Sequence, residues 1–271
     1  MPRKKNVYTQ LVEKVFAERY KDGSIEVPFD RADIEPTAEQ LGIQLPKNLG
    51  DVVYSFRYRT SLPETIREKA PEGHEWIIRS VGRGHYKFAL VPEARFIPSS
   101  MLVETKILDS TPGVITKYSF SDEQALLAKL RYNRLIDIFT GLTCYSLQNH
   151  LRTTVPEMGQ VETDEIYIGI DSRGALYVLP VQAKGGTDQI GVVQIEQDFA
   201  VCATKFPQLT CRPIASQFMD DEIIVLFEFE QTEQGIRIVA ERHYRLVRPE
   251  DLSPEELEMY RRRPSQPQPD V

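Results

Sequence analysis

The sequence predicts an α/β protein in which a mixed β-sheet flanked by helices follows a smaller N-terminal region of helices and a hairpin. Residues 6–59 place apolar side chains at helical spacing on both sides of a glycine turn. Two pairs of β-rich runs, at 75–91 and 159–184, are each joined by a short turn. A helical pattern at 187–207 then leads into further strand-like runs. A chain of 271 residues is long enough for two hydrophobic cores.

Composition narrows the functional classes. With 41% hydrophobic and 27% charged residues the chain is typical of globular proteins. Its net charge of -7 excludes bulk attraction to nucleic acid, so a DNA contact needs a local basic face. Residues 1–95 contain 16 Lys and Arg against 14 Asp and Glu, so this part of the chain is a better candidate for such a basic face than the acidic remainder. The three cysteines lack metal or disulfide spacing, and no secretory signal or membrane span is evident, so we expect a soluble, cytoplasmic protein.

The N-terminal elements follow in order along the chain. Residues 6–20 have helical spacing, and a short helix at 36–41 is expected to end at Gly42. A second helical pattern covers 49–59, which makes a helix-turn-helix unit. The segment EWIIRSVGRGHYKFALV, 75–91, then places two β-rich runs around a Gly-Arg-Gly turn, which predicts a basic hairpin.

This order resembles the winged-helix family over residues 7–95. In that family the second helix enters the major groove of DNA and the hairpin, or wing, touches the backbone. The resemblance implies contacts with double-stranded DNA from side chains around the second helix and the hairpin: Lys47, Asn48, Arg57, Arg59, Arg83 and His85. A small αβ domain used for protein contacts remains the alternative.

The C-terminal elements begin after a segment rich in Pro, Ser and Thr. Acidic residues at 121–124 predict the start of a helix that ends at Gly141, and a further helix is predicted over 144–154. Strand-like runs follow the helical pattern of 187–207, and the chain ends in a Pro/Gln-rich stretch. We therefore predict a DNA-binding domain, a connecting segment, an α/β domain and a flexible tail: 1–98, 99–121, 122–250 and 251–271.

The hairpin GQVETDEIYIGIDSRGALYVLPVQAKGG, 159–186, carries the most distinctive chemistry. If Ile170 lies opposite Ala175, Glu165 shares a sheet face with Gln182 and Lys184, and Asp164 points to the other face. One bulge in either strand would exchange the two acids. Carboxylate and amide oxygens suit Mg²⁺, and the lysine can stabilise charge on a phosphate, so this pattern favours phosphodiester cleavage.

An acid on one strand followed by Gln-x-Lys on the next resembles the PD-(D/E)XK nucleases, and Val-Gln-Ala-Lys resembles their Mrr-type restriction endonuclease branch, over residues 122–230. The resemblance implies a restriction-endonuclease-like core. It makes Glu165 or Asp164 the metal-binding acid, Gln182 a second Mg²⁺ ligand and Lys184 the catalytic lysine. Thr163 stands where the family has proline, and Gln182 is neutral where an acid is usual. For the family's additional helix carboxylate, Asp137 is the candidate.

The resemblances together imply a Mg²⁺-dependent DNA endonuclease of restriction type that acts as a homodimer. A cognate methyltransferase is a further partner that such an enzyme could have. Asn149, His150 and Arg152, just before the acidic strand, are candidates to line a DNA cleft. Gln194, on the helix after Lys184, is a candidate to face the site. Three alternatives stay open: a branched-DNA resolvase or repair nuclease, a non-catalytic DNA-binding regulator on a degenerate nuclease fold, and a structural or interaction protein. In the last two, Lys184 is a solvated strand end, and the upstream acids discourage edge pairing.

Overall fold

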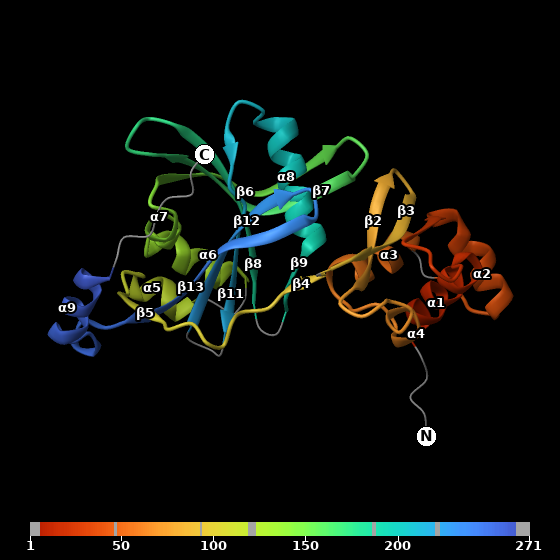
Figure 1. Cartoon of the computed structure of the whole chain (residues 1–271), viewed down its shortest axis with the longest axis horizontal. Coiled ribbons are helices and arrows are strands. Elements are labelled where there is room, and N and C mark those ends of the chain that lie inside the picture. The colour runs from red at the N-terminus through yellow and green to blue at the C-terminus, as the bar shows by residue number, and fades with distance from the viewer. Residues whose placement is uncertain are drawn as a thin grey trace, which may run out of the picture.

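A computed structural model describes residues 6–45, 48–92, 94–118, 123–185, 188–219 and 223–263. It shows a small N-terminal region of helices and short strands, coloured red to orange in Figure 1, beside a larger region built on long strands. The larger region is a mixed sheet flanked by helices, so the α/β architecture predicted from the sequence is confirmed.

The N-terminal region packs helices on one three-stranded antiparallel sheet, in the order β1-β3-β2. Its elements are α1 (Val7–Arg19), β1 (Glu26–Asp30), a 3-10 turn (Arg31–Asp33), α2 (Ile34–Leu41), α3 (Leu49–Tyr58), α4 (Glu64–Arg67), β2 (Glu75–Gly82) and β3 (His85–Val91). The ring of Phe16 contacts those of Trp76 and Phe88 edge to face, with centroids 5.3 and 5.0 Å apart. These aromatic contacts join α1 to the sheet.

Local signals explain where the N-terminal helices start and stop. Gly42 takes the left-handed conformation, with φ at +62°, and ends α2 as expected. Asn48 caps α3, because its side chain accepts a hydrogen bond from the backbone N–H of Gly50. Both helices and the hairpin were predicted, whereas β1 was not.

The larger region is one eight-stranded mixed sheet, in the order β5-β13-β12-β11-β8-β7-β6, with β10 paired to β8. Neighbours are antiparallel except β8 with β10 and β11, and β13 with β5. The strands are β5 (Thr105–Leu108), β6 (Thr143–Val155), β7 (Gly159–Ile170), β8 (Leu176–Lys184), β10 (Thr210–Cys211), β11 (Ile214–Met219), β12 (Ile223–Thr232) and β13 (Gly235–Val247). The helices are α5 (Gly113–Tyr118), α6 (Glu123–Tyr132), α7 (Leu135–Thr140), α8 (Val192–Lys205) and α9 (Pro254–Arg262).

The two sheet faces are covered by different helices. Leu179, Val181 and Ala183 of β8 pack with α6 and α7, whereas Val178 of the same strand packs with Val201 on α8. Alternate residues of a strand point to opposite faces. Gln182 must therefore face α8, which places it between the sheet and that helix.

Three sequence expectations need correction or completion. Residues 144–154 form strand β6, not a helix, because the segment pairs with β7 along nearly its whole length. The predicted connecting segment 99–121 contributes β5 to the main sheet, so pairing with β13 draws it into the α/β region. The predicted tail begins with helix α9, which is held by Lys106 through its ion pair with Glu256 at 2.8 Å.

Several polar contacts and an apolar cluster that includes Ile77 and Val193 fix the N-terminal region to the sheet region. Strand β4 (Arg95–Phe96) pairs with β9 (Ile190–Gly191), the short strand before α8. Arg79 of β2 donates a forked pair of hydrogen bonds to Glu196 of α8, and Gln197 of α8 bonds the Tyr58 hydroxyl. Helix α3 is thereby held against the end of the sheet where Gln182 lies.

Candidate functional site

The register of the β7–β8 hairpin decides which acid meets Gln182 and Lys184. The structure pairs Ile170 with Leu176, not with Ala175, so the predicted register is wrong by one residue. The reason lies in the turn, where the Asp171 carboxylate accepts hydrogen bonds from the backbone N–H groups of Arg173 and Ala175. These bonds, which also lower the pKa of Asp171, keep Ala175 in the turn. A shift of one residue moves every side chain to the other face.

Asp164, not Glu165, therefore joins Gln182 at the end of the sheet. The ladder ends with Glu165 opposite Val181, and beyond it the Asp164 carboxylate crosses the gap to accept a hydrogen bond from the backbone N–H of Ala183 at 2.8 Å. Burial raises the pKa of Asp164, while the Ala183 bond and the charge of Lys184 oppose the rise. Among the described residues, the second carboxylate oxygen of Asp164 accepts no hydrogen bond, and Lys184 lies near it.

Gln182 is 2% exposed, and its amide is oriented by a carboxylate beneath it. The Gln182 Nε2 atom donates to both oxygens of Asp198 on α8, at 3.0 and 3.1 Å. Asp198 is fully buried and also accepts from the Thr163 hydroxyl at 2.6 Å. Burial raises the pKa of Asp198 to about 8. Because Nε2 is engaged, the amide oxygen of Gln182 faces the other way, toward Gln194 Nε2 at 3.5 Å.

Lys184 brings a third element to the site. Its ammonium lies 2.8 Å from a carboxylate oxygen of Glu123, at the first turn of α6. The helix carboxylate that lies beside Lys184 is therefore that of Glu123, not that of Asp137, the candidate from the sequence. Asp137 instead bonds Arg134 and the backbone N–H of Cys144, away from this group. The acidic helix start at Glu123 was visible in the sequence, but its contact with Lys184 was not.

Glu165 lies on the opposite side of the sheet. It is fully buried and accepts hydrogen bonds from Arg131 at 3.1 and 3.2 Å and from the Ser146 hydroxyl at 2.5 Å. Arg131 also reaches Asn149 at 3.5 Å. The predicted site residues Glu165 and Asn149 thus belong to a different cluster from Asp164, Gln182 and Lys184.

The three converging side chains lie in a cleft of about 540 Å³ between the sheet end and α3. Two of the predicted nucleic-acid contacts, Arg57 and Arg59, line it from α3, and Arg152 lines it from β6. Tyr54 and Tyr58 alternate with these arginines, and the guanidinium carbon of Arg59 lies 5.0 Å from the Tyr54 ring centre. A basic and aromatic wall therefore faces an acidic one.

The other predicted contacts lie elsewhere. Arg83 is at the β2–β3 turn, and His85 pairs there with Asp30 at 2.6 Å, so the hairpin does not line the cleft. Asn48 caps α3, and Lys47 lies outside the described residues. His150 and Gln194, both candidates from the sequence, line the cleft, and Gln197 lines it without having been predicted.

The oxygen donors beside Lys184 are the carboxylates of Asp164 and Glu123 and the amide of Gln182, and the carboxylates of Glu162 and Asp188 also line the cleft. Within the described ranges no group of three His, Cys, Asp or Glu side chains is arranged to hold a metal ion. Mg²⁺ binds to proteins through one or two carboxylates and keeps several waters. Two hard carboxylates with an oriented amide oxygen fit this ion and do not fit a zinc centre.

No family model, curated protein or solved structure matches the chain. No helix among the residues that the structure describes is long and apolar enough to cross a bilayer. Since fold alone does not determine activity, the function must be argued from the geometry.

Proposed function

We propose that the chain is a Mg²⁺-dependent endonuclease of the PD-(D/E)XK type, which hydrolyses phosphodiester bonds in DNA. The observation that carries this proposal is the convergence of Asp164, Gln182 and Lys184 in one cleft whose opposite wall carries arginines. A carboxylate, an amide oxygen and an ammonium match the needs of a reaction at a phosphate, where oxygen ligands and a positive charge are required together.

Each side chain has a distinct part in this mechanism. Asp164 and the Gln182 amide oxygen would hold the ion, with the Glu123 carboxylate as a further candidate ligand. The ion would polarise a phosphate oxygen and lower the pKa of a water molecule. Lys184 stabilises the charge that develops on the phosphate, and Asp198 positions Gln182. No covalent intermediate with the protein is required.

The N-terminal region supports DNA binding. Its element order and its sheet order β1-β3-β2 are those expected of a winged-helix-like domain, and its α3 helix ends at the cleft. We infer that Arg57 and Arg59 contact phosphates close to the bond that is cut, so the domain delivers the strand to the site. Cutting both strands of a duplex needs two such sites, which favours a homodimer.

The test compares cleavage of supercoiled plasmid with Mg²⁺ and with EDTA, using wild-type protein, Lys184→Ala and a matched control, Lys205→Ala. Lys205 is exposed at the end of α8, away from the cleft. We expect EDTA to abolish cutting, Lys184→Ala to slow it by about 100-fold or more, and Lys205→Ala to cut normally. Cutting by Lys184→Ala at the wild-type rate would contradict the proposed role of the lysine.

A second candidate is a DNA-binding regulator without catalysis. The Lys184–Glu123 ion pair favours it, because it occupies the ammonium and the carboxylate nearest to it. This candidate predicts that wild-type protein binds DNA but does not nick it, with Mg²⁺ present. A resolvase or repair nuclease would instead cut branched or damaged DNA in preference to plain duplex.

A further inference from the structure

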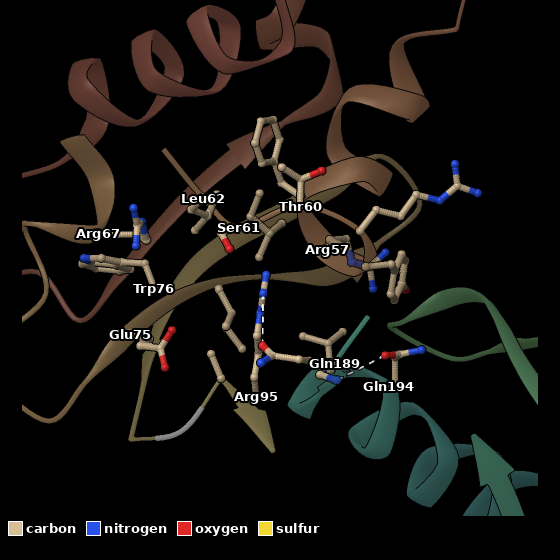
Figure 2. Close-up of a pocket in the computed structure, with 18 of the residues that line it drawn as sticks. Arg57, Thr60, Ser61, Leu62, Arg67, Glu75, Trp76, Arg95, Gln189 and Gln194 are labelled. Carbon is tan, nitrogen blue, oxygen red and sulfur yellow. Dashed lines mark hydrogen bonds between the residues drawn. The ribbon is translucent and has the colours of Figure 1, made fainter. Parts of the chain in front are cut away.

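A second pocket lies beside the candidate active site, between the N-terminal region and the sheet region. Its volume is about 170 Å³, and four arginines line it: Arg57, Arg59, Arg67 and Arg95. Figure 2 shows Arg95 in the middle, Arg67 and Trp76 on one side, Arg57 on the other and Ser61 close by. The arginines come from the end of α3, from α4 and from β4, and Asp188, Gln189 and Gln194 of the sheet region line the other side, so the pocket forms only when the two regions are assembled.

These four guanidinium groups make no ion pair with a carboxylate among the described residues. Arg95 reaches only the amide oxygen of Gln189, at 3.5 Å. The Arg57 Nε atom is buried without a hydrogen-bond acceptor in the part of the chain that the structure describes, and so is the Trp76 indole nitrogen. Buried donors without acceptors are costly, and native structures rarely keep them.

Other arginines of the same chain are satisfied by acids. Arg79, Arg131 and Arg212 each bond a glutamate through a forked or doubled contact. Two acids, Glu75 and Asp188, do line the pocket, but neither forms an ion pair with its arginines among the described residues. Four cations against two acids leave the pocket positive in a chain whose net charge is -7. No carboxylate among the described residues supplies the acceptors that these guanidinium groups could bond.

We propose that this pocket binds a phosphate group. The guanidinium fork matches phosphate oxygens in geometry, and such charge-assisted hydrogen bonds are the stronger kind. The hydroxyls of Thr60 and Ser61 line the same pocket and add neutral donors. A carboxylate ligand would present two oxygens, whereas a phosphate presents enough acceptors for guanidinium groups that arrive from three elements.

The position of the pocket suggests the source of that phosphate. Arg57, Tyr58 and Gln194 line both this pocket and the cleft that holds Lys184. A nucleic-acid strand in the cleft would therefore pass a neighbouring phosphate to the pocket. This assignment to nucleic acid rests on the proposed function, but the binding of phosphate itself does not.

The first test measures phosphate binding without DNA. Thermal unfolding is followed in inorganic phosphate and in chloride at the same ionic strength, for wild type, Arg67→Gln, Arg95→Gln and the control Arg248→Gln. Arg248 is exposed and lines neither the pocket nor the cleft. We expect phosphate to raise the midpoint of wild type and Arg248→Gln, with binding about tenfold weaker in the two pocket variants. Equal midpoints of wild type in both salts would overturn the proposal.

The second test identifies the source of the phosphate. Binding of labelled duplexes with 5′-phosphate or 5′-hydroxyl ends is measured in EDTA, which prevents Mg²⁺-dependent cutting. An equal loss of affinity for both duplexes in Arg67→Gln and Arg95→Gln indicates an internal phosphate, and a loss confined to the 5′-phosphate duplex indicates a strand end. A phosphate-dependent midpoint with unchanged DNA affinity overturns the nucleic-acid source and assigns the pocket to a free phosphate compound. Absence of plasmid cutting alone would refute the nuclease and leave the pocket standing.

Discussion

Asp164 and Glu165 are consecutive residues of β7 with the same functional group, yet they lie in opposite environments. The Asp164 carboxylate lies in the cleft, beside Lys184, and one of its oxygens has no hydrogen bond among the described residues. Glu165 lies fully buried on the other face, where Arg131 and Ser146 bond one oxygen. Each acid has one oxygen without a hydrogen bond among the described residues, but the Glu165 Oε2 atom is buried inside the fold, whereas Asp164 lines an open cleft. The comparison separates an acid that a ligand can reach from an acid enclosed by packing.

The environments of Asp164 and Glu165 differ because consecutive residues of a strand point to opposite faces of the sheet, not because the residue types differ. A carboxylate that neutralises a guanidinium at a buried site stabilises the fold, because breaking the pair leaves buried charge without compensation. A carboxylate that lines an open cleft beside an ammonium is better suited to bind an ion or a substrate, because a ligand can reach its oxygens. The same pleat places Arg131 and Lys184 on opposite sides of one sheet. The predictions below test this separation.

Asp164→Asn carries the largest expected effect. Loss of the negative oxygen should reduce Mg²⁺-dependent plasmid cutting by about 100-fold or more, because the ion would lose the carboxylate ligand that lies beside Gln182 and Lys184. Burial already disfavours the charged form of Asp164, so the free energy of unfolding should stay the same or rise. Plasmid cutting and urea unfolding of the same preparation measure both. Lost stability with full activity would reverse the two roles.

Glu165→Gln should show the opposite pattern. The amide keeps the shape but removes the charge that Arg131 and Ser146 bond, and hydrogen bonds to charged groups contribute about 1.5–3 kcal/mol. We expect the free energy of unfolding to fall by that amount. Under conditions where the variant is still folded, it should cut plasmid at the wild-type rate. Asp164→Asn is the matched control, one residue away on the other face. A folded Glu165→Gln protein that fails to cut would place Glu165 in the site.

The sequence was sufficient for most elements but not for their register. Helical periodicity, glycine turns and β-rich runs correctly predicted α1, α2, α3, α8 and the two hairpins. The face of Asp164 could not be predicted, because it depends on whether Ala175 belongs to the turn. Two hydrogen bonds from Asp171 decide this, and no pattern in the strands reveals them.

Contacts distant in sequence explain what else was missed. Strand β6 was predicted as a helix because its stability comes from pairing with β7, which local propensity does not report. Glu123 meets Lys184 across 61 residues, and Asp198 meets Gln182 from a helix on which only Gln194 had been a site candidate from the sequence. The candidate site residues were visible in the sequence, but their supporting partners became evident only in three dimensions.

The pH dependence of stability in Asp198→Asn tests whether the buried acid on the cleft side of the sheet is neutral in the folded protein. The pKa of Asp198 is about 8 in the folded protein and about 3.9 in an unfolded chain. The folded state holds the proton more tightly, so this group's stability contribution is complete below pH 4 and is lost as the pH rises through about 8. Asparagine does not titrate. We expect the variant to match wild type at pH 4 and to exceed it in unfolding free energy at pH 9.

Chemical denaturation at the two pH values measures this difference, and Asp22→Asn, an exposed turn residue, is the control. A wild type that loses no more stability than Asp198→Asn between pH 4 and pH 9 would show that Asp198 is ionised in the folded state. In that case Asp198 would contribute a negative charge beneath Gln182, and the site would have a further acid rather than a neutral support.

Ser146→Ala carries the smallest expected effect and tests how completely the two faces are separated. The variant removes one of the donors to Glu165 and leaves the bonds from Arg131, so about 1 kcal/mol should be lost from the free energy of unfolding. Ser172→Ala, in the exposed β7–β8 turn, should lose less. Because β7 lies between Ser146 and the cleft, phosphodiester cutting and its Mg²⁺ dependence should not change. A changed Mg²⁺ dependence in Ser146→Ala would show that the buried cluster reaches through the sheet and adjusts the position of Asp164.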